Sequence, residues 1–294
     1  MTTILFCEAD KRILQAAQTL QQEGKNVLLV GDKEAYDAIE ETTLQVIPIE
    51  PETYAQEYYE RRKHKGITLQ QAKQALTEPA TYACMLLAQN KADVLIAGAT
   101  WPTSKTLRPA LQLLKKGLAS SYFLMKTNKG EYYFADCALN IQPTSQELAQ
   151  IAINTAQAAQ KKGVKPKIAM LSFSTAGSAA HTDQEKVAQA TTTVQKHIQE
   201  NNLNWIVEGE IQVDAALNTE VTKQKNPDTT LHGEANILIF PDLDAANIGY
   251  KLVQQYTGCQ AIGPIITGLQ KEVHDLSRGC SAEEIVELAR VVCE

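Results

Sequence analysis

The chain has 294 residues, of which 44% are hydrophobic and 21% are charged, and its formal net charge at pH 7 is −6. This composition is typical of a globular enzyme, and the acidic balance argues against non-specific nucleic-acid binding, which needs a basic face. No apolar run reaches the ~20 residues of a membrane-spanning helix. We therefore expect one large or two medium-sized domains, and neither a nucleic-acid nor a membrane partner.

The six cysteines are widely scattered and include no Cys-x-x-Cys pair. This spacing is typical of free thiols in a reducing compartment rather than of a disulfide framework or a zinc site. The five histidines include no His-x-x-x-His pair, so no metal site is predicted. We therefore expect a cytoplasmic protein without a bound metal.

The first predicted elements form a βαβ unit. Apolar strands at residues 2–6 and 26–30 flank a helix at residues 12–22, which has Ile13 and Leu20 on one face. This order predicts a parallel sheet with a right-handed crossover. The pattern then predicts a buried strand at residues 93–97 and helices at residues 54–62, 68–76, 81–90 and 106–116.

The rest of the chain alternates between strands and helices. Residues 122–126 and 131–135 flank a short polar turn and predict a β-hairpin. Strands are predicted at residues 167–173 and 235–240, and helices at residues 145–162, 183–200, 245–255 and 282–293. The alternation predicts an α/β fold with helices on both faces of the sheet.

Two predicted strand-end loops are rich in polar side chains. Residues 172–178 carry four hydroxyls and a glycine, so their backbone N–H groups and the next helix N-terminus could bind an anion, although a cluster of helix-capping residues would look the same. Residues 241–247 carry two aspartates and an asparagine that lead into a helix. Ligands of open α/β sheets bind at the carboxyl ends of strands, so we expect these loops to converge.

Arginine is scarce, because only six of the 28 basic residues are Arg. Arg61, Arg62, Arg108 and Arg278 lie in polar, turn-rich segments. Guanidinium groups bind phosphate oxygens in a bidentate fork that lysine cannot form, which predicts a multiply phosphorylated small molecule as ligand. Standard motifs are missing, since no G-x-G-x-x-G follows an early strand. His274, Asp275 and Ser277 lie too close in sequence for a hydrolytic triad, which is assembled from distant segments.

Seven segments, in order and spacing, resemble the phosphate acetyltransferase (phosphotransacetylase) family. They are ERRKHKGIT (60–68), TSKTLRPALQLLKKG (103–117), YYFADCALN (132–140), KIAMLSFSTAGS (167–178), VEGEIQVDAAL (207–217), ANILIFPDLDAANIGYKL (235–252) and AIGPIITGLQKEVHDLSRGCSAEEIV (261–286). The resemblance implies the reversible reaction of acetyl-CoA and phosphate to acetyl phosphate and CoA, by direct transfer in a ternary complex. CoA is then a substrate, and no cofactor is expected.

The resemblance also implies the architecture. The expected fold has two three-layer αβα domains with an interdomain cleft and is related to isocitrate and isopropylmalate dehydrogenases. Residues 1–119 and 267–294 would form a discontinuous first domain. Residues 120–266 would form the second domain, through which a homodimer is expected.

Site residues follow from the same resemblance. Arg62, Arg108 and Arg278 match arginines that contact phosphate or CoA, and Ser277 matches a serine beside the reacting thiol and carbonyl. Glu284 stands where the family has an aspartate base, although Glu283 and Glu284 could simply be first-turn acids of the last helix. The remaining expected substrate-binding residues are Thr103, Ser172, Ser174, Thr175, Gly177, Ser178, Asp244 and Asn247, together with Cys137 and Cys280, which are not expected to be nucleophiles.

The chain departs from the family pattern at several positions. Glu284 is one methylene longer than aspartate, Gln255 replaces an arginine implicated in CoA binding, Lys105 replaces an aspartate and Ala176 a lysine. Three alternatives therefore stay open: a phosphate butyryltransferase, a catalytically weakened CoA- or phosphate-binding protein, and a metal-dependent decarboxylating dehydrogenase of the related fold. The last is disfavoured by the missing dinucleotide fingerprint.

Overall fold

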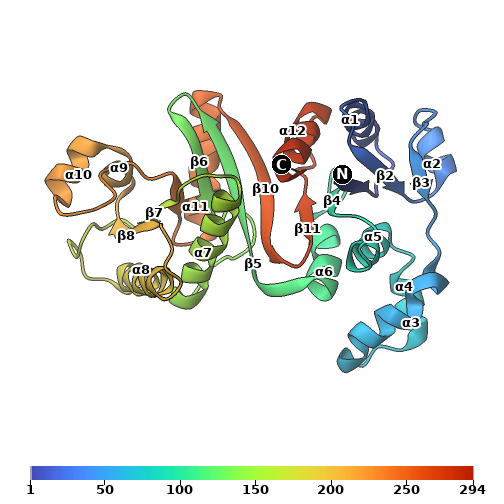
Figure 1. Ribbon diagram of the computed structural model, residues 1–294, viewed down its shortest axis with the longest axis horizontal. Coiled ribbons are helices and arrows are strands. Elements are labelled where there is room, and N and C mark those ends of the chain that lie inside the picture. Colours follow the sequence, from blue (N-terminus) through green and yellow to red (C-terminus); the bar gives the residue numbers. More distant parts are fainter. Residues whose placement is uncertain (1, 294) are drawn as a thin grey trace. The chain divides into compact units, whose positions relative to one another are not determined.

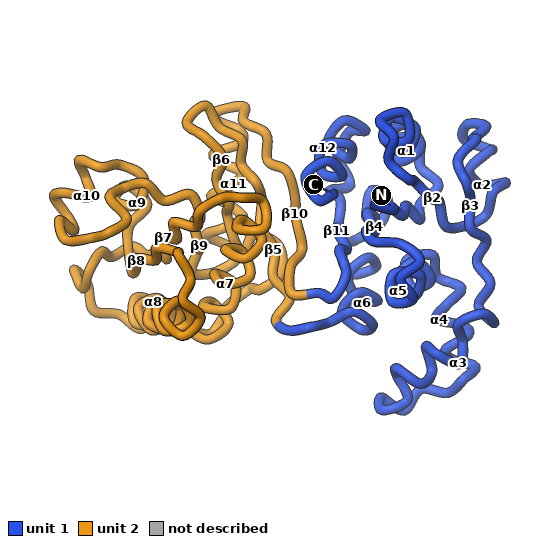
Figure 2. Tube along the Cα trace, viewed as in Figure 1, with its two compact units in different colours: residues 1–117, 269–294 blue, residues 118–268 orange. Residues whose placement is uncertain are grey.

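The computed structural model describes residues 2–293 and has a mixed α/β fold with two separate sheets. The chain divides into two compact units, each with its own sheet (Figure 2). Unit 1 comprises Met1–Gly117 and Leu269–Glu294, and unit 2 comprises Leu118–Gly268. None of the described helices is both long and apolar enough to cross a membrane.

Unit 1 is built on a five-stranded sheet with the order β11-β4-β1-β2-β3 (Figure 1). The neighbouring strands are parallel. The strands are β1 (Thr3–Phe6), β2 (Asn26–Val30), β3 (Gln45–Ile47), β4 (Val94–Ala97) and β11 (Glu272–Asp275). The helices are α1 (Lys11–Gln22), α2 (Lys33–Asp37), α3 (Pro51–Arg62), α4 (Leu69–Ala75), α5 (Pro79–Ala88), α6 (Thr103–Leu113) and α12 (Ala282–Cys293), with a short 3₁₀ turn at Lys63–Lys65.

The strand order of unit 1 reverses direction next to β1. From β1 the chain proceeds to β2 and β3 on one side, and it then returns to β4 and β11 on the other side. Right-handed crossovers therefore place α1 and α5 on opposite faces of the sheet, and α12 packs beside α1 while α6 packs beside α5. All four residues of β4 are buried, as expected for a central parallel strand. The carboxyl ends of β1 and β4 consequently form a topological switch point, where open α/β sheets bind ligands.

Unit 2 has a six-stranded sheet with the order β10-β5-β6-β9-β7-β8. The β5–β6 pair is an antiparallel hairpin, whereas β6, β9, β7 and β8 run parallel to one another. The strands are β5 (Lys115–Thr127), β6 (Gly130–Ala135), β7 (Lys167–Leu171), β8 (Ile206–Ile211), β9 (Ile237–Ile239) and β10 (Gln260–Leu269). The helices are α7 (Ser145–Lys161), α8 (Thr182–Glu200), α9 (Val213–Leu217), α10 (Thr219–Lys225) and α11 (Leu243–Thr257).

Side-chain caps start several helices at the expected places. Thr144 and Glu147 form a capping box at α7, in which the Thr144 hydroxyl accepts from the Glu147 N–H and the Glu147 carboxylate accepts from the Thr144 N–H. Asp10 caps α1 and Asp242 caps α11 by accepting backbone N–H groups of the first turn. Asp10 and Asp242 lie within four residues of the ends of β1 and β9, so they also determine where those strand-end loops finish.

The structure corrects several predicted boundaries. The helix predicted at residues 106–116 begins at Thr103 and ends at Leu113, and Lys115 already belongs to β5. The strand predicted at residues 167–173 ends at Leu171, which releases Ser172 into the loop. The strands β3, β8, β10 and β11 were not predicted. In β8 and β11 buried polar residues, including Glu210, His274 and Asp275, interrupt the apolar pattern that sequence analysis relies on.

Candidate active site

In unit 1, three strand-end loops meet at one edge of the sheet. They follow β1, β4 and β11, which are parallel neighbours in the sheet, so their carboxyl ends lie side by side. The loops comprise residues 7–10, 98–102 and 276–281. The last of these carries Ser277 and Arg278, so the structure places two of the expected catalytic residues at the switch-point edge.

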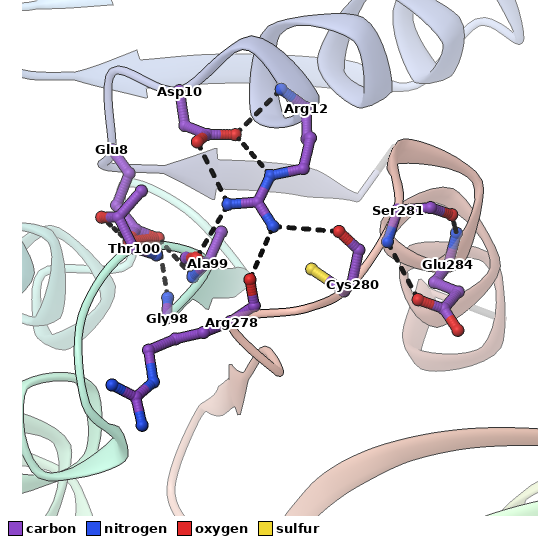
Figure 3. A network of polar contacts seen from close by, with 10 residues as sticks. All are labelled: Glu8, Asp10, Arg12, Gly98, Ala99, Thr100, Arg278, Cys280, Ser281 and Glu284. Carbon is purple, nitrogen blue, oxygen red and sulfur yellow. Dashed lines mark hydrogen bonds and ion pairs between the residues drawn. The ribbon is translucent and has the colours of Figure 1, made fainter.

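A buried carboxylate holds the loop after β4. Glu8 is only 3% exposed, and its Oε2 accepts hydrogen bonds from the N–H groups of Gly98 (2.7 Å) and Ala99 (3.0 Å). Its Oε1 accepts from the backbone N–H (3.0 Å) and the hydroxyl (2.8 Å) of Thr100. Figure 3 shows these donors gathered around one carboxyl group. Four donors on one carboxylate fix the backbone that leads into α6.

Arg12 connects all three loops of unit 1 (Figure 3). Its Nη1 donates to the carbonyl oxygens of Arg278 (2.9 Å) and Cys280 (3.0 Å), and its Nη2 donates to the carbonyl of Ala99 (2.8 Å). The carboxylate of Asp10 accepts from Nε at 3.0 Å and from Nη2 at 3.1 Å. One guanidinium group thus determines the backbone shape of the loop after β11.

The side chains of Ser277 and Arg278 are exposed, and Figure 3 shows the Arg278 guanidinium pointing away from this network. Arg12 binds only the backbone carbonyl of Arg278, and the Arg278 guanidinium has no hydrogen bond or ion pair within the described part of the chain. Among the described residues, the Ser277 hydroxyl takes part in one long hydrogen bond, which it accepts from the Gly279 N–H at 3.4 Å. The loop therefore presents a free cation and a free hydroxyl on a braced backbone, which suits an anionic ligand.

Asp275 ends β11 two residues before Ser277 and is 2% exposed. Its Oδ2 accepts a 2.5 Å hydrogen bond from the hydroxyl of Thr103, the first residue of α6. Burial raises the pKa of Asp275 to about 6, and the hydrogen bonds from Thr103 and Thr106 partly offset that rise. A Cβ at Gly98 would lie 2.3 Å from Oδ1 of Asp275, so only glycine allows this close approach.

Glu284 occupies a structural position at the start of α12 (Figure 3). Its Oε2 accepts from the N–H of Ser281 at 2.9 Å, and its own N–H donates to the Ser281 hydroxyl at 3.2 Å. This reciprocal pair is a capping box. Cys280 beside it is 7% exposed, and burial raises the pKa of its thiol to about 11. A thiol with that pKa is protonated at neutral pH and is a poor nucleophile.

The other expected arginines of unit 1 lie on helices. Arg62 is the last residue of α3 and half-buried, and it bonds the hydroxyl of Tyr58, while its Nε is buried without a hydrogen-bond partner among residues 2–293. Arg108 is an exposed residue of α6, the helix that begins at Thr103. No described hydrogen bond or ion pair links either guanidinium to the three loops.

In unit 2, the hydroxyl-rich loop after β7 binds a carboxylate of the protein itself. Glu210, near the end of β8, is 5% exposed and accepts from the Gly177 N–H at 2.6 Å and from the Ser174 hydroxyl at 3.3 Å. Burial raises the pKa of Glu210, but these hydrogen bonds and one from Gln184 outweigh it, so the pKa lies below its ordinary value. The anion held by this loop is thus Glu210.

The remaining hydroxyls of this loop differ in their availability. The Thr175 hydroxyl is buried and bonded to Gln212, and the Ser178 hydroxyl accepts from the Thr175 N–H at 3.1 Å. Ser172 is half-buried, and its N–H donates to the carbonyl of Ile211. The hydroxyls of Ser174 and Thr175 therefore maintain the loop, whereas Ser178 is exposed.

A second carboxylate-centred loop follows β6. Asp136 is 3% exposed and accepts from the Ser121 hydroxyl, from the side chain of Asn140 and from the N–H groups of residues 138–140. Cys137 is fully buried, and burial raises the pKa of its thiol well above the ordinary value. Asn247 of α11 donates to the Cys137 carbonyl at 3.2 Å, while Asp244 in the first turn of α11 is exposed.

Sequence reasoning missed the residues that hold these loops. They are Glu8, Asp10, Arg12, Asp136, Glu210 and Asp275. A signal existed, because most of them are acids at or just beyond the carboxyl end of an apolar strand, where a charged residue needs a nearby partner. Among the described residues, no group of three or more His, Cys, Asp or Glu side chains is placed to hold a metal ion.

Comparison with known proteins identifies the family that this chain matches. A family model described as phosphate acetyl/butaryl transferase matches residues 1–293. The phosphate acetyltransferase of Clostridium acetobutylicum is 40% identical over 98% of this chain and 92% of that protein, and the one of Bacillus subtilis is 41% identical over 98% and 93%.

Solved structures agree with these relatives. The EutD phosphotransacetylase from Staphylococcus aureus superposes with a TM-score of 0.91 at 37% identity, and the match covers 99% of this chain and 92% of that one. A branched-chain phosphotransacylase from Enterococcus faecalis superposes with a TM-score of 0.73 at 22% identity, covering 100% and 98%, which shows the same fold.

Proposed function

This chain belongs to the phosphate acetyl/butaryl transferase family and is an acyltransferase, and we propose that it transfers an acetyl group reversibly between CoA and inorganic phosphate. The observation that carries the site assignment is the free Arg278 guanidinium beside Ser277 on a loop that Arg12 braces. The acetyl assignment is supported by about 40% identity to proteins named phosphate acetyltransferase. CoA is a substrate in this reaction, and we propose that no cofactor takes part.

The proposed chemistry is a direct transfer in a ternary complex. The CoA thiolate attacks the acetyl carbonyl of acetyl phosphate, the carbon–sulfur bond forms, and the bond to the phosphate oxygen breaks. Arg278 and Ser277 stabilise the negative charge on the carbonyl oxygen and on the leaving phosphate. The raised thiol pKa values of Cys137 and Cys280 support their exclusion as acetyl carriers.

Proton removal from the CoA thiol needs a base, and the resemblance assigns this role to Glu284. The carboxylate of Glu284 already accepts from the Ser281 N–H, so its availability is the part of the proposal to test first. If Glu284 is the base, Glu284→Gln lowers kcat and leaves the KM for CoA nearly unchanged, while Glu283→Gln is the matched control on the same helical turn. If both variants keep the wild-type kcat, a group other than Glu284 removes the proton.

We propose that the remaining expected residues bind the substrates. Arg62 and Arg108 are assigned to phosphate groups of CoA, because a permanently charged guanidinium binds them well and neither pairs with a carboxylate among the described residues. Thr103, Asp244, Asn247, Ser172 and Ser178 provide further polar contacts. Ser174, Thr175 and Gly177 act through the loop shape, because their polar groups are engaged with Glu210 and Gln212.

A homodimer formed through unit 2 is part of the proposal. The helix α11 carries Ile248, Leu252 and Tyr256 at four-residue spacing, and they are 58%, 50% and 87% exposed. Such a stripe of exposed apolar residues on one helical face supports a contact with a second copy. Sedimentation at micromolar concentration tests it: a dimer that Leu252→Asp converts to a monomer is expected, and a monomeric wild type would refute the contact.

A cytoplasmic location is also proposed. All six cysteines are free thiols, which is the state favoured in a reducing compartment. Fractionation of cells that express the tagged full-length chain, with a periplasmic or secreted marker as control, tests this location.

One assay tests the central proposal. Acetyl phosphate and CoA are mixed with the protein, and acetyl-CoA is measured, with butyryl phosphate as the competing substrate. A butyryl rate above the acetyl rate would favour the phosphate butyryltransferase alternative, because pocket volume decides acyl choice. CoA binding without turnover of either acyl phosphate would favour the catalytically weakened binding protein.

A further inference from the structure

Asp275 is a buried carboxylate that the proposed chemistry leaves without a role. It lies at the carboxyl end of β11, at the same sheet edge as Ser277 and Arg278, and is 2% exposed. Its Oδ1 has no hydrogen-bond partner among the described residues, although a buried carboxylate normally satisfies both oxygens. A structural anchor such as Glu8 binds four donors instead.

Thr103 connects this buried carboxylate to the surface. Its hydroxyl donates to Oδ2 of Asp275 at 2.5 Å, a short distance that is typical of a charge-assisted hydrogen bond. The residue itself is exposed at the first position of α6. Because its proton is directed toward Asp275, the Thr103 oxygen presents its lone pairs to a ligand.

The surroundings of Asp275 favour proton uptake. Burial raises its pKa to about 6, and the charged group whose field adds to this rise is Glu8, beyond the end of β1. The neighbouring helix α6 contributes two hydroxyls, Thr103 and Thr106, and β4 contributes the backbone at Gly98. A general base works best when its pKa lies near the working pH.

Glu284 differs from Asp275 in its burial and in its hydrogen bonds. Its carboxylate is exposed and completes the capping box of α12. The geometry thus separates a carboxylate that caps a helix from one that is poised to take up a proton.

On the basis of the proposed function, we propose that Thr103 and Asp275 form a proton relay that accepts the thiol proton of CoA. The thiol proton moves to Thr103 Oγ1 while the Thr103 hydroxyl proton moves to Asp275 Oδ2. Thr103 ends neutral, Asp275 ends protonated, and the thiolate is free to attack the acetyl carbonyl. The reverse transfer returns the proton through Thr103 to the thiolate when acetyl phosphate is made.

Substitutions at Thr103 test the relay without removing a buried charge. Thr103→Val keeps the shape and removes the hydroxyl, Thr103→Ser keeps the hydroxyl, and Ser104→Ala removes the neighbouring exposed hydroxyl as the matched control. We expect Thr103→Val to lower kcat about 100-fold with the KM for CoA changed less than about threefold, because general base catalysis contributes ~10²–10⁴. Thr103→Ser should recover most of the kcat that Thr103→Val loses, and Ser104→Ala should stay close to wild type.

The pH profile and a double variant separate a relay from a structural role. The wild-type kcat should fall as the pH drops below about 6, because Asp275 becomes protonated, and Thr103→Val should lose this acidic limb. Asp275→Asn should be as slow as Thr103→Val, with no further loss in the double variant, because the two residues act as one unit. A Thr103→Val enzyme within about threefold of wild-type kcat, an unchanged acidic limb, or losses that multiply would each overturn the relay.

Urea unfolding at several pH values tests the titration of Asp275 without any assay of activity. Its folded pKa is raised above the ~3.9 of an unfolded chain, so its contribution to stability is present below about pH 4 and is lost as the pH rises through about 6. Asp275→Asn should remove this slope, and an unchanged slope would overturn the proposal. A wild type that forms no acetyl-CoA would refute the proposed function instead, whereas an active wild type with an unaffected Thr103→Val refutes the relay alone.

Discussion

The loop after β11 in unit 1 and the loop after β7 in unit 2 are held in opposite ways. In unit 1, Arg12 binds the backbone carbonyls of the loop after β11, and the side chains of Ser277 and Arg278 are exposed. In unit 2, the loop after β7 directs the Gly177 N–H and the Ser174 hydroxyl at the carboxylate of Glu210. A cation that binds carbonyls leaves positive side chains available, whereas an acid that binds N–H groups fills an anion site. We therefore expect the phosphoryl group to bind at the loop after β11 in unit 1.

The largest expected effect is that of a substitution of Arg278. Arg278→Lys keeps the charge and loses the bidentate fork, so we expect kcat/KM to fall about 30-fold or more with little change in stability. Steady-state kinetics with acetyl phosphate and CoA, together with thermal unfolding, measure both. Near wild-type kinetics would show that Arg278 does not bind the phosphoryl group, and the loop after β11 would then not differ from the loop after β7 in this function.

Loss of the hydrogen bonds from Arg12 should have the next largest effect. Arg12→Lys cannot reach the carbonyls of Ala99, Arg278 and Cys280 together, so we expect kcat to fall about tenfold and the unfolding free energy to fall by about 2 kcal/mol. The control is Arg61→Lys, a surface arginine on α3 that is paired with Glu57. An Arg12→Lys enzyme with full activity would show that the loop keeps its shape without the brace.

Glu210, which holds the loop after β7, should contribute more to stability than to catalysis. Glu210→Gln removes the charge that the loop donors stabilise, so we expect a loss of about 1–2 kcal/mol and about a threefold change in kcat. The lowered pKa of Glu210 means that its contribution to stability is present above the ordinary glutamate pKa of ~4.3 and is lost as the pH falls through the folded value. Urea unfolding between pH 3 and 7 should therefore show a smaller acid-induced loss in Glu210→Gln. A tenfold loss of kcat would indicate that this loop belongs to the catalytic site.

The smallest expected effect is that of Cys280→Ser. The raised thiol pKa predicts no covalent acetyl-enzyme, so kcat should stay within about threefold of wild type. Mass spectrometry of the enzyme mixed with acetyl phosphate should find no acetylated cysteine. An acetyl group trapped on Cys280 or Cys137 would overturn the ternary-complex chemistry.

Much of the fold could be predicted from the sequence. Apolar strands such as β1 and β2 and amphipathic helices such as α1, α7 and α12 have strong periodic patterns, and the structure has them within a few residues of the predicted bounds. Buried charged strands were missed, because β8 and β11 place Glu210, His274 and Asp275 inside the protein. Periodicity treats such residues as exposed, and only long-range partners make their burial favourable.

The sequence by itself determined the family, the polar segments and the rare arginines, since these are local patterns of residue type. Only the tertiary structure decided which of those groups are free. Arg12 bonds the carbonyls of Arg278 and Cys280, which lie 266 and 268 residues away along the chain, and Asp275 bonds Thr103, which lies 172 residues away. The role of each charged group depends on its burial and on the partners that parallel strand pairing brings together. These decide whether a guanidinium holds a loop or is free to bind a phosphate, and whether a carboxylate caps a helix or accepts a proton.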